Sequence, residues 1–122
     1  MAETIALAVS NVRLREALRE QTIRDPLTRL YNRRYLEDSL NREISRARRA
    51  GSSVGIIMID IDNFKLFNDS LGHPMGDQLL CSLGTYLNAR VRPEDIPSRL
   101  GGDEFTVLLS GASRGDLPRG WR

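Results

Sequence analysis

Two acidic clusters, one of them beside a pair of glycines, are the residues of this chain best suited to chemistry. Gly101 and Gly102 separate two short β-prone stretches, and both can take positive φ without a Cβ penalty, so they predict a tight hairpin turn. Asp103 and Glu104 follow at once, where a turn can aim both carboxylates at one point. Backbone amides beside paired carboxylates suit a phosphate that is held through a metal ion.

The second acidic cluster ends the apolar run of residues 54–59. Asp60 and Asp62 are two residues apart, so they share a face if the run is a strand. If that strand ends beside the glycine turn, Asp60 and Asp103 can meet over one cation. Taken alone, the glycine pair fits a hairpin whose acids are merely solvated. The presence of a second acidic strand end argues against that alternative.

Composition places the chain among small soluble globular domains. It has 122 residues, of which 40% are hydrophobic and 28% charged, and the single Cys81 excludes an internal disulfide. No apolar run is long enough to cross a bilayer, and the N-terminus lacks a signal-peptide pattern. We therefore expect a cytoplasmic protein without a membrane segment.

The charge distribution bears on the kind of ligand. Residues 54–110 hold 4 basic and 8 acidic side chains, so a phosphate group would not approach them without a divalent cation such as Mg²⁺ or Mn²⁺. The basic residues lie mainly along predicted helices and form no platform with aromatic residues. Nucleic acid is therefore a poor candidate partner.

Periodicity and turn residues predict an alternation of helices and strands. We expect helices over residues 3–23 and 32–50, a strand over 54–60, a short helix or turn over 63–71, and a loop at 72–77 that opens a helix ending near residue 90. The 32–50 helix is predicted to bury Tyr35, Leu36, Leu40, Ile44 and Ala47. The helix ending near residue 90 is predicted to bury Leu79, Leu80, Leu83, Tyr86 and Leu87, with Cys81 packed in the same region.

The first helix carries a repeat with 4-3-4-3 spacing. The repeat positions are Leu7, Asn11, Leu14, Leu18 and Gln21. This spacing is typical of a two-stranded coiled coil, in which a polar Asn can fix the register. A single amphipathic helix packed on its own domain fits the same spacing, and the sequence leaves both interpretations open.

Several short motifs lie in a fixed order along the chain. They are DPLT at 25–28, YNRR at 31–34, DIDNFK at 60–65, ND at 68–69, GH at 72–73, GD at 76–77 and GGDEF at 101–105. Together they resemble the GGDEF domain family, whose active members are diguanylate cyclases of bacterial signal transduction. The resemblance covers residues 25–110 and implies an α+β, ferredoxin-like or nucleotidyl-cyclase-like fold, preceded by a linker helix over residues 1–24.

The chain departs from the family pattern at two places. Arg29 stands where the family usually has glycine, which predicts a strained turn. Residues 111–122 read as an irregular tail, whereas family domains continue with further helices and strands. We therefore expect a GGDEF fold that lacks its C-terminal part, with an unpaired edge on the 54–60 strand that favours self-association or unfolding. We also expect the missing part to impair the family's activity in this chain.

The resemblance implies the condensation of two GTP molecules into cyclic di-GMP, with release of pyrophosphate, in a homodimer. It assigns the divalent ion, Mg²⁺ or Mn²⁺, to Asp60 and Asp103, with the carbonyl of Ile61 as a further ligand and Glu104 in support. Asp103 and Glu104 are the implied catalytic residues, and Asp103 is the one expected to help deprotonate the attacking hydroxyl.

The resemblance also implies a set of substrate contacts. It assigns the phosphates to Lys65 and to the glycine turn at 101–102, the guanine to Asn68 and Asp77, and a substrate-side position to His73. For Asp77 there is a chemical reason as well, because a carboxylate accepts from both N1–H and the exocyclic amine of guanine, a donor pair that adenine lacks. Without the resemblance, Asp77 would be an acid near a helix N-terminus and Lys65 an exposed lysine.

Arg92 and Asp95 match the RxxD motif with which many family members bind cyclic di-GMP as an inhibitor. An arginine can grip phosphate or stack on guanine while the acid reads the guanine edge. Two further interpretations remain for the whole chain: a catalytically inactive remnant that binds GTP or cyclic di-GMP, and a dimerising fragment without a ligand.

Overall fold

The computed structural model describes residues 2–111 and contains helices and strands in alternation. In chain order they are α1 (Ala2–Ile23), α2 (Arg33–Ala50), β1 (Gly55–Asp60), α3 (Phe64–Leu71), α4 (His73–Arg90), β2 (Ile96–Gly101) and β3 (Glu104–Leu109). The predicted α+β class is confirmed. The main difference from expectation is that α4 begins directly at His73, because a proline in the first turn has the φ that a helix needs and lacks only an amide that would be unpaired there.

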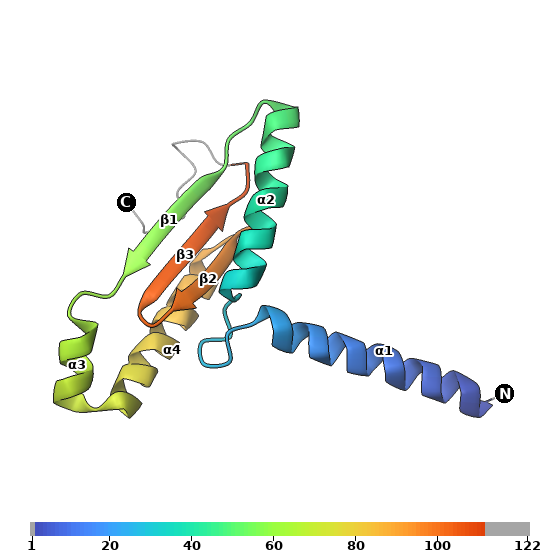
Figure 1. Cartoon of the computed structure of the whole chain (residues 1–122), viewed down its shortest axis with the longest axis horizontal. Helices are drawn as coiled ribbons and strands as arrows, with labels where there is room; N and C mark the ends of the chain where they lie inside the picture. The colour runs from blue at the N-terminus through green and yellow to red at the C-terminus, as the bar shows by residue number, and fades with distance from the viewer. Residues whose placement is uncertain (1, 112–122) are drawn as a thin grey trace.

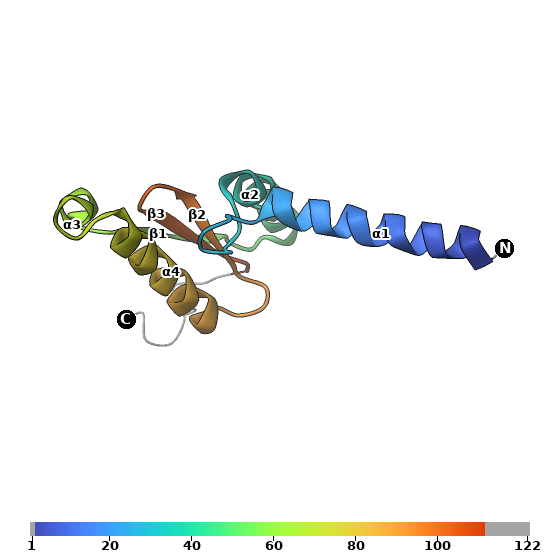
Figure 2. The ribbon, with the colours of Figure 1, turned by 90° about the horizontal axis from the view of Figure 1, so that it is seen from below.

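The three strands form one antiparallel sheet in the order β1-β3-β2. β2 and β3 are joined by the predicted glycine hairpin, and Asp60 at the end of β1 lies opposite Glu104 at the start of β3. Helices α2 and α4 lie on opposite faces of this sheet (Figures 1 and 2). The turn of the hairpin, the end of β1, α3 and the start of α4 therefore gather at one end of the molecule (Figure 1).

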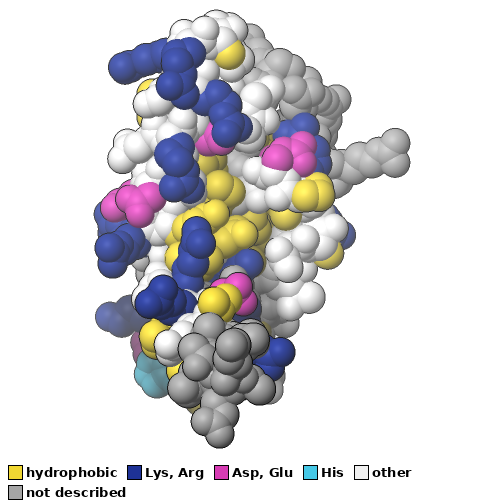
Figure 3. All heavy atoms as spheres, turned by 90° about the vertical axis from the view of Figure 1, so that its right-hand side faces the viewer, with side chains coloured by type: hydrophobic (Ala, Val, Ile, Leu, Met, Phe, Trp, Pro, Cys, Tyr) yellow, Lys and Arg dark blue, Asp and Glu magenta, His cyan; other side chains and the backbone are white. Residues whose placement is uncertain are grey.

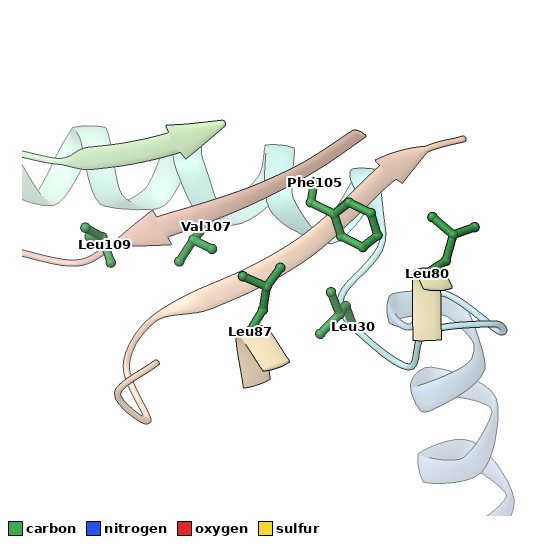
Figure 4. Packing of buried hydrophobic residues seen from close by; sticks show 6 residues of the cluster. All are labelled: Leu30, Leu80, Leu87, Phe105, Val107 and Leu109. Atoms are coloured by element: carbon green, nitrogen blue, oxygen red, sulfur yellow. The ribbon is translucent and has the colours of Figure 1, made fainter. Parts of the chain in front are cut away.

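The core lies between β3 and α4. Alternate residues of β3 point toward α4, as expected for a strand, and meet Leu30, Leu80 and Leu87 (Figure 4). Phe105 is 1% exposed and Val107 is fully buried, which makes β3 the most enclosed strand of the described residues. The strand that carries Asp103 and Glu104 at its start is thus anchored by its apolar continuation.

Two of the predicted buried residues are exposed, one on each main helix. On α2, Leu36 and Ala47 are buried, but Ile44 is 37% exposed because it belongs to the margin of the helix face that meets the sheet. On α4, Leu80 and Leu87 are buried, but Tyr86 is 44% exposed and its ring lies 3.5 Å below the guanidinium of Arg90. A hydrophobic stripe predicts the buried centre of a helix face better than its margins.

Cys81 is half-buried, and its thiol donates a hydrogen bond to the carbonyl of Leu27 at 3.3 Å. Arg46, Arg48 and Arg49, near the end of α2, are exposed. Figure 3 shows basic side chains around a strip of hydrophobic ones on the side of the molecule from which α1 projects.

Helix α1 extends away from the sheet (Figures 1 and 2). Leu14 and Leu18, two of the predicted repeat positions, are 62% and 59% exposed. The alternative in which this helix packs on its own domain is therefore wrong at these two positions. Among the described residues, no helix is both long and apolar enough to cross a membrane.

Strand β1 lies at an edge of the sheet formed by the described residues, where its only strand partner is β3. The predicted unpaired edge of this strand is confirmed for that part of the chain. Ile56 and Met58 on β1 are 50% and 75% exposed. Self-association or easy unfolding through this edge stays a prediction.

Candidate functional site

The two acidic clusters meet at the end of β1. The hairpin turn places Gly101 and Gly102 at φ values of +152° and +50°, and Asp103 follows directly. The amide of Ile61 donates to the carbonyl of Asp103 at 3.4 Å, which joins the residue after β1 to the residue after the turn. In a regular strand, Asp103 and Glu104 would point to opposite faces of the sheet. Because Asp103 belongs to the turn instead, its side chain can lie beside Asp60.

The carboxyl groups of Asp60 and Asp103 are within hydrogen-bonding distance of one another. The hydrogen bond and the negative charge of Asp103 raise the pKa of Asp60, and a slight loss of hydration and the charges of Glu104 and Asp62 add to the effect. Asp60 is exposed and Asp103 half-buried. The carboxylates of this acidic pair therefore repel one another when both are ionised. A proton shared between them, or a bound cation, removes the repulsion.

The donor set of the acidic pair fits a hard divalent cation. It offers carboxylate oxygens from Asp60 and Asp103, with the main chain of Ile61 alongside, and oxygen is the ligand that Mg²⁺ and Mn²⁺ prefer. Within residues 2–111, no group of three or more His, Cys, Asp or Glu side chains comes together as a complete metal site. A cation held by only two carboxylates takes its remaining ligands from water and from substrate phosphates, which is the usual arrangement for Mg²⁺.

The residues predicted to contact guanine lie at the junction of α3 and α4. The side chain of Asn68 on α3 lies against Gly76 on α4 so closely that a Cβ at Gly76 would overlap the amide oxygen of Asn68. That oxygen is buried and has no hydrogen-bond partner among the described residues. Asp77 follows Gly76 and is exposed. The structure therefore brings Asn68 and Asp77 into one corner, which we term the α3–α4 corner.

Two more predicted substrate residues lie near this corner. His73 is exposed in the first turn of α4, and Lys65 is exposed in the first turn of α3. Within the part of the chain that the structure describes, neither side chain makes a hydrogen bond or an ion pair. Their roles, like those of the other predicted site residues, stay predictions.

Arg92 and Asp95 form a tight local pair between α4 and β2. Asp95 Oδ2 accepts from the Arg92 amide at 2.9 Å and from Arg92 Nε at 3.3 Å, and Oδ1 accepts from Arg92 Nη2 at 3.3 Å. The Asp95 side chain has no exposed surface, whereas that of Arg92 is 43% exposed and also lies 3.4 Å from Glu94. In this arrangement Asp95 orients Arg92, and Arg92 is the exposed member of the pair.

An open cleft of about 310 Å³ adjoins this pair. Its lining includes Arg24, Tyr31, Asn88 and Arg92. The guanidinium of Arg24 lies 3.9 Å from the centre of the Tyr31 ring, so that wall of the cleft is a cation–π stack.

Sequence reasoning assigned no role to Arg99 or Asp25, yet they form a partly buried ion pair across the fold. Arg99 Nη1 lies 3.3 Å from both carboxylate oxygens of Asp25, and each side chain is only 16% exposed. The same guanidinium donates to the carbonyl of Gly102. The sequence signal for this ion pair was an arginine two residues before the glycine turn. That signal does not identify the partner, because Asp25 lies 74 residues away in the sequence.

Comparison with known proteins agrees with this geometry. Residues 22–117 match the family model described as "Diguanylate cyclase, GGDEF domain". The chain is 43% identical over 91 residues to the diguanylate cyclase DgcS of Shewanella oneidensis, covering 75% of this chain and 31% of DgcS. It is 40% identical over 100 residues to the response regulator PleD of Caulobacter vibrioides, covering 82% of this chain and 22% of PleD.

Solved structures give the same result. The coiled coil and GGDEF domain of DgcB from Caulobacter crescentus, in complex with c-di-GMP, superposes with a TM-score of 0.82 at 31% identity, covering 93% of this chain and 61% of that one. The diguanylate cyclase SiaD of Pseudomonas aeruginosa, in complex with its activator SiaC, superposes with a TM-score of 0.78 at 38% identity, covering 94% and 46%. The chain thus spans less than a third of the curated relatives named above, and it belongs to the GGDEF domain family of diguanylate cyclases.

Proposed function

We propose that the chain provides one half-site of a diguanylate cyclase, which condenses two GTP molecules into cyclic di-GMP. The observation that supports this best is the contact between the carboxyl groups of Asp60 and Asp103 beside the glycine turn, in a chain of this family. Because GTP is a cytoplasmic nucleotide, the proposal also places the reaction in the cytoplasm.

The acidic pair would hold the divalent ion, Mg²⁺ or Mn²⁺, through Asp60, Asp103 and the Ile61 carbonyl, with Glu104 in support. When bound, such an ion neutralises phosphate charge and lowers the pKa of a nearby hydroxyl. Asp103 would accept the proton of the attacking hydroxyl. Its carboxylate lies at the turn and is only half-buried, so a substrate hydroxyl can reach it.

The reaction is a phosphoryl transfer made twice. The 3′-hydroxyl oxygen of one GTP bonds to the α-phosphorus of the other, the bond from that phosphorus to the bridging oxygen of the β-phosphate breaks, and pyrophosphate leaves with its electron pair. The same step with the roles of the two nucleotides exchanged closes the ring and releases a second pyrophosphate. Little else is asked of the protein than positioning and charge stabilisation.

The α3–α4 corner would select the base. Asp77 would accept from N1–H and the amine of guanine, and the unpaired Asn68 oxygen would gain a donor from the same base. Lys65 and the amides of Gly101 and Gly102 would meet the phosphates, and His73 the substrate side of the corner. Leaving one polar atom unpaired in the absence of ligand makes the presence of a base in this corner more favourable.

A second copy of the chain is needed because one half-site holds only one reactant. The exposed leucines of α1 support a parallel pairing of two copies, in which Leu14 and Leu18 pack against their equivalents. The relative DgcB was solved with a coiled coil attached to its GGDEF domain, which supports the same arrangement.

The proposal is tested by incubating the purified chain with GTP and Mg²⁺ and identifying the products by chromatography. We expect cyclic di-GMP and pyrophosphate from the unaltered chain and none from Asp103→Asn. Absence of product from a folded chain that dimerises and binds GTP would overturn the cyclase assignment.

A second candidate is binding of cyclic di-GMP without catalysis. The preformed pair of Arg92 and Asp95 favours it, since the exposed guanidinium is already oriented beside a cleft. Titration with cyclic di-GMP should then show binding by the unaltered chain and weaker binding by Arg92→Ala. Equal affinities would exclude Arg92 as the contact.

A further inference from the structure

The guanidinium of Arg99 bridges two parts of the chain that sequence reasoning treated separately. From β2, its Nε and Nη2 atoms donate to the carbonyl of Gly102 at 3.1 and 2.9 Å. Its Nη1 atom donates to the two carboxylate oxygens of Asp25, each at 3.3 Å. One planar group thus holds both the glycine turn and the segment that follows α1.

Asp25 is itself fixed in place. Its Oδ2 atom accepts from the amide and the hydroxyl of Thr28, each at 2.8 Å, and its amide donates to the carbonyl of Leu30 at 2.7 Å. Burial on its own would raise the pKa of Asp25, but the bonds from Thr28 and the charge of Arg99 outweigh it, so the pKa is lowered below 3.8. Asp25 is therefore a charged, well-held anchor at neutral pH.

The segment that carries Asp25 is bonded to the end of α1. Asn32 donates from its amide to the carbonyl of Ile23 at 2.8 Å and from its side chain to the carbonyl of Thr22 at 2.7 Å. Tyr31 exchanges main-chain bonds with β2, as donor to Pro97 at 3.1 Å and as acceptor from Arg99 at 2.9 Å. The last turn of α1 and the strand before the glycine turn therefore share one network of bonds.

The glycine turn needs such an external support. Gly101 and Gly102 have no side chains, both lie at positive φ, and a Cβ at either would meet nothing within 4 Å. Such a turn has many accessible conformations when nothing holds it. A carbonyl that accepts two hydrogen bonds from one rigid guanidinium loses most of that freedom.

We infer that Arg99 is a positioning residue that holds the Gly102 carbonyl, and with it Asp103 beside Asp60, at a place set by the segment that ends α1. The inference rests on the proposed function, since the acidic pair matters as a site only if it binds the cation. A shift of the end of α1 relative to β2 then reaches Asp103 through Asp25 and Arg99.

Amide hydrogen exchange by NMR on the full chain tests this without metal or nucleotide. The variants are Arg99→Lys, which keeps the charge but cannot make both sets of bonds, and Asp25→Asn, which removes the anchor's charge. The matched control is Arg33→Lys, because the one ion pair of Arg33 among residues 2–111 is an exposed pair with Glu37 at 3.0 Å. The reporter is the amide of Ile61, which donates to the Asp103 carbonyl.

We expect exchange at Ile61 and in the turn to quicken roughly tenfold in both variants, while the amides of β3 and all amides of the control keep their rates. Unchanged exchange at Ile61 in both variants would overturn the inference. Equal acceleration across β3 would also overturn it, since it would show general loss of stability rather than lost positioning.

Binding of Mn²⁺, followed by electron paramagnetic resonance on the same samples, separates this inference from the proposed function. We expect both variants to bind Mn²⁺ about tenfold more weakly than the unaltered chain, as is typical when the residues that orient a ligand are changed. Wild-type affinity in a variant whose turn exchanges faster would contradict positioning of Asp103. If the unaltered chain binds no Mn²⁺, the proposed metal site fails, while the exchange rates still decide the role of Arg99.

Discussion

Four aspartates of this chain form two groups with opposite surroundings. Asp25 and Asp95 are enclosed, and each carboxylate accepts hydrogen bonds from an arginine and from main-chain amides. Asp60 and Asp103 instead face one another, with a raised pKa at Asp60. The protein supplies hydrogen-bond donors and positive charge to the carboxylates of the first group, whereas the carboxylates of the second group face each other's negative charge.

This difference distinguishes carboxylates that stabilise the fold from those we propose to bind a ligand. A folded chain gains stability from acids that are paired with its own donors, and it loses stability by placing two acids together. A repelling pair is favourable only when something outside the described residues binds there. The comparison therefore supports the proposal that Asp60 and Asp103 bind a ligand, whereas Asp25 and Asp95 are bonded to the fold itself.

The largest expected effect is on cation binding. Asp60→Asn and Asp103→Asn should each weaken Mn²⁺ binding by on the order of a hundredfold, because each removes one of only two carboxylate ligands. Calorimetric titration with Mn²⁺ measures this. Glu94→Gln, which changes an exposed acid elsewhere, serves as the control, and an affinity in either Asp variant equal to that of the control would remove the basis of the comparison.

Next in size is the stability contribution of Asp95. Asp95→Ala should lower the free energy of unfolding by about 2 kcal/mol, since it leaves the Arg92 amide without its buried acceptor. Glu94→Gln is again the matched control, because the exposed pair of Glu94 with Arg92 contributes at most about 0.5 kcal/mol. Urea unfolding followed by circular dichroism gives both values, and a loss no larger than that of the control would show that Asp95 is not structural.

The two groups should also respond to pH with opposite signs. The lowered pKa of Asp25 means that its stabilising effect is complete above its ordinary value of 3.8 and is lost as the pH falls through the folded value. The raised pKa of Asp60 means that its ionisation destabilises the fold as the pH rises from 3.8 through the folded value.

Melting temperatures of Asp25→Asn and Asp60→Asn between pH 2 and 7, without metal, test these signs. The deficit of Asp25→Asn relative to the unaltered chain should shrink toward pH 2. Asp60→Asn should melt at or above the temperature of the unaltered chain at pH 7 and lose that advantage in acid. Curves for both variants that run parallel to the unaltered chain would contradict the assignment.

The smallest effect concerns the turn beside Asp25. Arg29 has φ of +64°, a conformation that costs a residue with a Cβ roughly 1 kcal/mol, as its place in the motif predicts. Arg29→Gly should therefore stabilise the chain by about 0.5 kcal/mol after the extra entropy of glycine is counted. Arg29→Ala keeps the Cβ and should give no gain in the same urea experiment, and equal gains from both would exclude backbone strain as the cause.

Local patterns made much of this arrangement predictable. The glycine pair fixes the hairpin, the apolar run fixes β1, and the alternation of side chains along a strand brings Asp60 to its end. The meeting of Asp60 and Asp103 needs one condition more, the pairing of β1 with β3, which these local patterns do not supply. α2 was equally predictable, since Asn32 caps its start by accepting from the Tyr35 amide at 2.9 Å.

Contacts that depend on register between distant segments were not predictable. The pairing of Arg99 with Asp25 requires knowing that the segment after α1 lies along β2, which no local pattern states. The burial of Asp95 could not be predicted from the sequence, because an acid in a turn ordinarily faces solvent. Tyr86 was expected inside from its spacing, yet the guanidinium of Arg90 gives its ring a favourable contact at the surface.

The isolated course of α1 has a mechanical consequence. A helix of 22 residues is about 33 Å long, so it acts as a lever whose short end is the bonded segment at Thr22 and Ile23. A sideways motion of about 5 Å at the far tip corresponds to a tilt of about 9° at that end. A weak force that moves the far tip by a large distance would thereby produce a smaller movement, with a larger force, at Thr22 and Ile23.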